Sequence, residues 1–144
     1  LQGDAVYHEL FEKLNSGFAE ISIKNCPDLA PILFAFVAAK NGGVFHDTKR
    51  LKIKESDRAQ VMATELRKFG AEIEVKENSV SVKATDFHAP SQLLHGHNDH
   101  RIVMALSVLL TLTGGEIDDT QVVCKSYPNF FEDLKSIGIE VEKI

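Results

Sequence analysis

The sequence has no tryptophan, two cysteines, two methionines and four prolines among 144 residues. Cys26 and Cys124 are too few for a disulfide scaffold and lie in no Cys-x-x-Cys motif, which favours a reducing, cytoplasmic setting and buried thiols. The longest apolar runs, residues 32–39 and 102–112, are far shorter than the ~20 residues that cross a bilayer. We therefore expect no membrane helix and no membrane partner.

Positive charge is in the minority. The chain has 16 Lys and Arg against 21 Asp and Glu, for a net charge of −5. Nonspecific binding to nucleic acids or anionic membranes depends on excess positive charge, so we expect no nucleic-acid partner. With 44% hydrophobic and 26% charged residues, the composition is that of a globular domain, and any anion must be bound locally.

An internal repeat divides the chain into two units, about residues 25–76 and 97–144. The segment GGVFHDT at 42–48 recurs as GGEIDDT at 114–120, and LRKFGAEIE at 66–74 recurs as LKSIGIEVE at 134–142. Each unit is expected to contain an apolar helix, a Gly-Gly break, a short strand, a basic connection, an amphipathic helix ending at a glycine, and a final strand.

The length of the chain fits one domain, and its first residue is leucine rather than methionine. We therefore expect residues 1–144 to be a single partial domain excised from a longer protein. Helices are expected at residues 5–15, 28–40 and 99–113, and strands at 71–75 and 79–83 should form a hairpin. The helices at 28–40 and 99–113 are apolar on nearly all sides, so both should be buried on every side. The fold class is therefore α/β (α+β), with helices inside and sheets outside.

Cations lie at three expected helix starts, where the helix dipole disfavours them unless an anion is near. Ser126 is the expected N-cap of the third of these helices. The shared placement predicts one site for phosphate or carboxylate groups. Alternatively, acids such as Asp57 and Asp99 balance the cations on a solvated surface. The cations are Lys54, Arg58, Arg101 and Lys125.

Two carboxylates in the same segments, Asp28 and Glu55, are candidates for acid/base work. Asp28 follows Pro27 at a helix start, where the dipole favours an acid in any case. Glu55 lies three residues before Arg58, as an ordinary ion-pair partner would. The spacing alone leaves both interpretations open.

The pattern His-x-His-x-x-His at His95, His97 and His100, with His88 nearby, raises the possibility of a metal site. No cysteine or glutamate completes a tetrahedral set at standard spacing, so we expect no metal. The Gly-Gly pairs follow helices rather than joining a strand to a helix, so we expect turns there and no phosphate-binding loop.

Four motifs in order resemble the C-terminal part of the 5-enolpyruvylshikimate-3-phosphate synthase family. They are CPDL at 26–29, RLKIKESDR at 50–58, NDHRIVMA at 98–105 and KSYPNFFE at 125–132. The KESDR and DHR pieces favour this family over the related UDP-N-acetylglucosamine enolpyruvyl transferases. The resemblance implies repeated βαβαββ units in an inside-out α/β barrel, with helices inside and sheets outside. The chain would then hold about two of the three units of one domain.

The resemblance also implies an activity. Members transfer the enolpyruvyl group of phosphoenolpyruvate to the 5-hydroxyl of shikimate 3-phosphate with release of phosphate, in chorismate and aromatic amino acid biosynthesis. They need no metal or cofactor, are inhibited by glyphosate, and are expected to be monomers when full length. A sugar-nucleotide enolpyruvyl transferase and a noncatalytic anion-binding domain remain the alternative functions.

The resemblance assigns roles to particular residues. Asp28 and Glu55 match the catalytic carboxylates, Asp28 acting on the 5-hydroxyl proton and Glu55 on the methylene carbon of phosphoenolpyruvate. The family's N-terminal domain, with its Lys-Ser motif and glycine-rich segment, has no counterpart here, so the isolated chain is expected to be inactive. Arg50 receives no role. The implied substrate-binding residues are Asp28, Lys54, Arg58, His100, Arg101 and Lys125.

Overall fold

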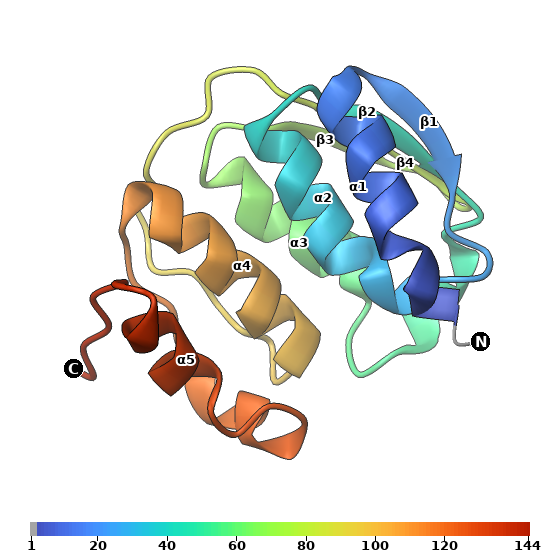
Figure 1. Ribbon diagram of the computed structural model, residues 1–144. Helices are drawn as coiled ribbons and strands as arrows, with labels where there is room; N and C mark the ends of the chain where they lie inside the picture. The colour runs from blue at the N-terminus through green and yellow to red at the C-terminus, as the bar shows by residue number, and fades with distance from the viewer. Residues whose placement is uncertain (1–2) are drawn as a thin grey trace.

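The computed structural model describes residues 3–144, in which one sheet lies against a layer of helices (Figure 1). Its four strands have the order β1-β2-β4-β3. They are β1 (Ala19–Ser22), β2 (Gly43–His46), β3 (Glu72–Val75) and β4 (Ser79–Lys83). β1 and β2 are parallel, whereas β4 is antiparallel to both β2 and β3. The predicted hairpin is therefore confirmed.

The helices fall close to their predicted positions. Helices α2, α3 and α4 run side by side in the same direction, so that they begin at the same end of the molecule (Figure 1). The α-helices are α1 (Tyr7–Ser16), α2 (Ala30–Ala39), α3 (Arg58–Arg67), α4 (His100–Thr113) and α5 (Phe130–Ser136). The 3-10 helices are η1 (Gly3–Val6), η2 (Pro27–Leu29), η3 (Lys49–Ile53) and η4 (Thr120–Lys125).

The helices cover one face of the sheet. Ile21, Phe45 and Val80 point into the core from three different strands, while Glu20 on the other face is exposed. Phe34 of α2 packs edge-on against Phe45, with ring centroids 4.8 Å apart. Alternation of buried and exposed residues along each strand produces this one-sided core. The expected arrangement of helices inside and sheet outside is confirmed.

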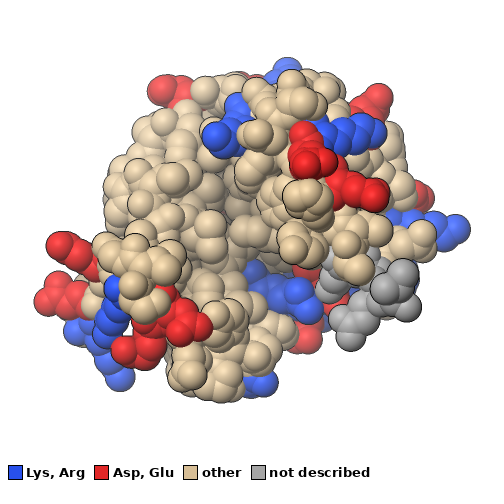
Figure 2. Space-filling view, in the orientation of Figure 1, with Lys and Arg blue, Asp and Glu red and all other residues tan. Residues whose placement is uncertain are grey.

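Helix α4 is less buried than predicted. It buries Ile102, Val103 and Leu106 but leaves Val108 and Leu112 exposed. Beyond Arg101 in its first turn, α4 has no charged residue, and the surface over the rest of the helix is tan in Figure 2. The prediction that this helix is buried on every side is wrong for the described chain, because no element of residues 3–144 covers that face.

The helices of the second repeated unit follow those of the first. Both units have a 3-10 helix after the Gly-Gly break and then an α-helix. The glycines that end the two α-helices, Gly70 and Gly138, have φ values of 91° and 95°. Both occupy the region in which glycine is favoured, so the same turn leaves both helices.

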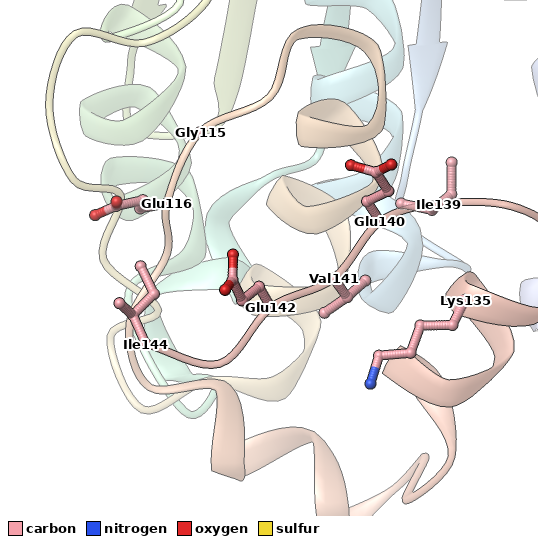
Figure 3. A pocket seen from close by; sticks show the side chains of 8 residues that line it. All are labelled: Gly115, Glu116, Lys135, Ile139, Glu140, Val141, Glu142 and Ile144. Carbon is pink, nitrogen blue, oxygen red and sulfur yellow. The ribbon is translucent and has the colours of Figure 1, made fainter.

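The strands predicted for the second unit do not form. Ile117 makes only an isolated bridge with Leu94, and residues 139–142 are in no strand. β4, which follows the first unit, lies between β2 and β3 and pairs with both, whereas no residue of 3–144 takes the matching place beside the second unit. A cavity of about 540 Å³ separates residues 115–116 from the C-terminal segment (Figure 3). A strand needs a hydrogen-bonding neighbour, so these segments stay irregular.

Cys26 is buried, as predicted, but Cys124 is exposed. The prediction of a buried thiol is wrong for Cys124 because η4 turns Val122 and Val123 inward, toward Phe130, and the next residue faces solvent. None of the described helices is both long and apolar enough to cross a membrane.

Candidate active site

A buried ion pair lies where α3 and α4 begin. Arg58, the first residue of α3, is 1% exposed, and Asp99, the N-cap of α4, is fully buried. Arg58 donates from Nε to Asp99 Oδ2 at 2.9 Å and from Nη2 to Oδ1 at 3.1 Å. Two parallel charge-assisted hydrogen bonds fix both the distance and the orientation of the two planar groups.

Arg58 also holds the two carboxylates expected to be catalytic. Its Nη1 donates to Asp28 Oδ1 at 2.9 Å, and its Nη2 donates to Glu55 Oε2 at 2.6 Å. Asp28 comes from the 3-10 turn before α2, and Glu55 from the segment before α3. One buried guanidinium therefore brings together side chains from separate parts of the sequence. We call Asp28, Lys54, Glu55, Arg58, Asp99 and Arg101 the ion cluster.

Two cations at the rim of the ion cluster contact Asp28. Lys54 Nζ lies 3.3 Å from Asp28 Oδ1. Arg101 Nη1 donates to the Asp28 backbone oxygen at 3.3 Å, and Arg101 Nη2 lies 3.8 Å from Asp28 Oδ2. Both cations are partly exposed, unlike Arg58, so they can meet an anion from solvent. In Figure 2, Lys and Arg side chains lie in a hollow with Asp and Glu atoms beside them.

N-cap hydrogen bonds position Arg58 and Arg101 at the starts of α3 and α4. Asp57 caps α3 by accepting a hydrogen bond from Gln60 N, and Asp99 caps α4 by accepting one from Arg101 N at 3.1 Å. Ser56 adds a hydrogen bond from its hydroxyl to Asp99 at 2.8 Å. Since an N-cap residue fixes the first turn, these bonds set the direction of the cations that follow.

The environment keeps two carboxylates of the ion cluster charged. Burial acts to raise the pKa of Asp99, but hydrogen bonds from Arg58 and Ser56 outweigh it and lower this pKa. Burial likewise acts to raise the pKa of Asp28, and Arg101 and Lys54 together lower it. For Arg58, burial acts to lower the pKa, and the bonds to Asp99 raise it. All three groups are therefore ionised at neutral pH.

The ion cluster is electrically balanced, with the three cations Lys54, Arg58 and Arg101 facing the three acids Asp28, Glu55 and Asp99. Of the two acids considered as partners from the sequence, Asp99 does pair with Arg58, whereas Asp57 serves as a helix cap. A bound anion must therefore replace a carboxylate at one of the cations or meet further positive charge.

Lys125 is not at a helix start. It is the last residue of η4, and Ser126 ends that 3-10 helix by donating its backbone N–H to Val123 O. α5 begins later, at Phe130 after the N-cap Asn129. The prediction of Ser126 as an N-cap is wrong because no helix begins after it: Ser126 closes η4, and residues 127–129 separate it from α5. Within residues 3–144 the exposed Lys125 makes no ion pair with the ion cluster.

His100 opens α4 between the two ion-cluster residues Asp99 and Arg101. The other two histidines of the motif bond to different carboxylates, His95 to Asp118 and His97 to Glu65. In the part of the chain that the structure describes, no three His, Cys, Asp or Glu side chains are grouped to hold a metal ion.

A groove of about 220 Å³ runs from the ion cluster along α2 and α4. Asp28 and Arg101 line the end nearest the charges, and the remaining walls are mostly apolar. The larger cavity of Figure 3 lies elsewhere, among Glu116, Glu140 and Glu142, and no ion-cluster residue lines it. The groove walls are formed by Asp28, Pro31, Ile32, Arg101, Met104, Ala105 and Val108.

The chain is similar to known proteins over most of its length. A family model described as EPSP synthase (3-phosphoshikimate 1-carboxyvinyltransferase) matches residues 4–134. The 3-phosphoshikimate 1-carboxyvinyltransferase of Clostridium acetobutylicum is 35% identical over 99% of this chain and 37% of its own length. That of Sulfurisphaera tokodaii is 37% identical over 88% of this chain and 30% of its own length.

Among solved structures, an EPSP synthase from Acinetobacter baumannii superimposes with a TM-score of 0.75 at 29% identity, covering 83% of this chain and 29% of that one. The chain thus spans well under half the length of these relatives. The family model nevertheless covers nearly all of its residues. The chain belongs to the EPSP synthase family.

Proposed function

We propose that this chain supplies part of the active site of a 3-phosphoshikimate 1-carboxyvinyltransferase. The observation that carries the proposal is that the buried Arg58 holds both Asp28 and Glu55, while Lys54 and Arg101 also contact Asp28. Family membership supports it. Because the chain spans 37% of a relative's length, further polypeptide, the N-terminal domain, would supply the remaining groups.

The reaction needs two proton transfers. In the addition step the 5-hydroxyl of shikimate 3-phosphate loses a proton as its oxygen bonds to C2 of phosphoenolpyruvate, and the methylene carbon gains one. In the elimination step the bond from C2 to the phosphate oxygen breaks and the carbon returns its proton. We assign the hydroxyl proton to Asp28 and the carbon proton to Glu55. Two positioned carboxylates can serve both steps in turn.

The cations bind the substrates and tune Asp28. Lys54 is assigned to shikimate 3-phosphate, and Arg58, Arg101 and Lys125 to phosphoenolpyruvate, with His100 beside them. Lys54 and Arg101 lower the pKa of Asp28 in the unliganded chain. When bound anions pair with Lys54 and Arg101, these cations stabilise the Asp28 carboxylate less, and Asp28 becomes a stronger base.

Charge balance limits what the chain does alone. Every cation of the ion cluster already faces a carboxylate, so phosphoenolpyruvate must displace one of these contacts or meet further positive charge to bind. We expect weak binding of phosphoenolpyruvate and no turnover by the isolated chain. Measurable turnover by the purified chain would contradict this expectation.

The proposal is tested with a grafted enzyme, the C. acetobutylicum relative in which residues 1–144 replace the segment they match. Phosphate release is measured with both substrates. Changing Glu55→Gln should lower turnover at least about a hundredfold, the usual contribution of a general acid or base. The matched control is Glu20→Gln, an exposed glutamate paired with His46 on the sheet, which should retain activity. Equal turnover by the graft and its Glu55→Gln variant would contradict the role assigned to Glu55, whereas a graft with no turnover would favour a noncatalytic anion-binding role.

A further inference from the structure

The loop of residues 93–98, which we call the α4 loop, leads directly into Asp99 of the ion cluster. Two consecutive residues of this loop, His97 and Asn98, have φ values of 53° and 54°. This left-handed conformation is uncommon for residues other than glycine. The surrounding structure must therefore impose it.

On one side the α4 loop is held by α3. Glu65 is fully buried, and its Oε1 lies 2.9 Å from His97 Nε2 while its Oε2 accepts a hydrogen bond from His95 N at 3.2 Å. Lys68 Nζ lies 2.8 Å from the same Oε2 and also donates to Leu93 O at 2.9 Å. Glu65 of α3 and Lys68, which directly follows this helix, thus contact the loop at Leu93, His95 and His97.

On the other side the loop is held by the second repeated unit. Asp118 accepts a hydrogen bond from Gly96 N at 2.8 Å and bonds to His95 Nδ1 at 2.7 Å. Asp119 accepts one from Asn98 N at 3.0 Å. The α4 loop is therefore fixed between the two units by three carboxylates.

The held loop ends in the ion cluster. Asp99 donates its backbone N–H to Gly96 O at 3.0 Å. Its carboxylate accepts two hydrogen bonds from Arg58 and one from the backbone N–H of Arg101, which caps α4. A shift of the loop would move the Asp99 carboxylate, and with it the guanidinium of Arg58. The contacts of Glu65 thus reach Arg58 through the α4 loop and Asp99.

Packing alone does not account for Glu65. The other buried residues on its part of α3, Met62, Ala63 and Leu66, are apolar. A buried carboxylate is costly unless it is paired and hydrogen-bonded. The partners of Glu65 are either the α4 loop itself or Lys68, which also bonds the loop.

We infer that Glu65 is a positioning residue for the active site: through His95 and His97 it fixes the α4 loop so that Asp99 holds Arg58 and Arg101 in their working positions. The inference rests on the proposed function of the ion cluster. It assigns no contact with substrate to Glu65.

The first test does not depend on catalysis. In the isolated ¹⁵N-labelled chain, Glu65→Gln should shift the Arg58 Nε–H signal and speed its exchange with water about tenfold, since Asp99 no longer holds it firmly. The matched control is Arg67→Gln on the same helix, which removes a hydrogen bond to Ile73 O far from the loop. If Glu65→Gln does not fold, His97→Gln, at a partly exposed position, makes the same test.

The second test uses the grafted enzyme. Glu65→Gln should lower kcat/KM for phosphoenolpyruvate about tenfold, whereas in an Asp99→Asn background the same change should cost less than about twofold, because its effect passes through Asp99. If Glu65 only stabilised the fold, the losses in kcat/KM caused by Glu65→Gln and by Asp99→Asn would add. An unmoved Arg58 signal, or additive losses, overturns the inference. An inactive graft overturns the proposed function and leaves the Arg58 signal to decide the role of Glu65.

Discussion

Replacing Asp99 with asparagine removes the negative charge of the buried ion pair and one of the two acceptor oxygens. Asparagine and aspartate are equally good N-caps, so α4 keeps its first turn. The volume of the side chain is unchanged. Asp99 accepts two hydrogen bonds from Arg58 and one from Ser56, and an amide with a single oxygen cannot accept all three.

The loss of folding stability caused by Asp99→Asn follows from these contacts. A hydrogen bond to a charged group contributes about 1.5–3 kcal/mol, and breaking a buried ion pair costs about 3–5 kcal/mol. Arg58 retains Asp28 and Glu55 as partners. We therefore expect Asp99→Asn to lower the free energy of unfolding by about 2–4 kcal/mol. At an m-value of ~2 kcal/mol/M, the urea midpoint falls by about 1–2 M.

Urea unfolding followed by circular dichroism measures this change. The matched control is Asp57→Asn, because Asp57 is also an N-cap and accepts its cap bond from Gln60 N, but it is partly exposed and makes no bond to Arg58. That variant should lose less than about 0.5 kcal/mol. If Asp99→Asn moves the midpoint no further than Asp57→Asn, the buried pair does not stabilise the fold as reasoned.

Two further predictions concern the same region. The folded-state pKa values of Asp28 and Asp99 are lowered, so their contribution to stability is present above about pH 4 and is lost as the pH falls through the folded values. Urea midpoints should therefore drop more steeply between about pH 6 and pH 3 in the parent chain than in Asp99→Asn, and equal slopes would contradict the assignment. A Cβ at Gly96 would lie 2.5 Å from Val103 Cγ2, so Gly96→Ala should cost about 1–3 kcal/mol in the same assay. At Gly17 a Cβ meets nothing within 4 Å, and an equal loss for Gly17→Ala would refute the steric reason.

The sequence was sufficient to predict the helices and the convergence of most cations. Helix starts are set by local caps such as Asp57 and Asp99, and the repeat implies parallel helices that begin at one end. Arg58 and Arg101 consequently meet at Asp28, as the motif positions suggested. Their roles in catalysis remain predictions.

The errors arose where structure depends on distant partners. Residues 139–142 have the composition of a strand, but no described segment pairs with them. α4 is apolar on faces that nothing in residues 3–144 covers. The burial of Asp99 and its two hydrogen bonds to Arg58 could not be predicted from the sequence, because they arise only when α3 and α4 pack together.

The most direct test of the substrate site is an amide chemical-shift titration of the labelled chain with phosphoenolpyruvate, with inorganic sulfate as the control anion. We expect the signals of Lys54, Glu55 and Arg101 to move together at millimolar phosphoenolpyruvate, further than with equal sulfate, because a planar carboxylate and a phosphate together match the guanidinium groups. Equal responses to the two anions, or shifts confined to other parts of the chain, would show that the ion cluster is not a site for phosphoenolpyruvate.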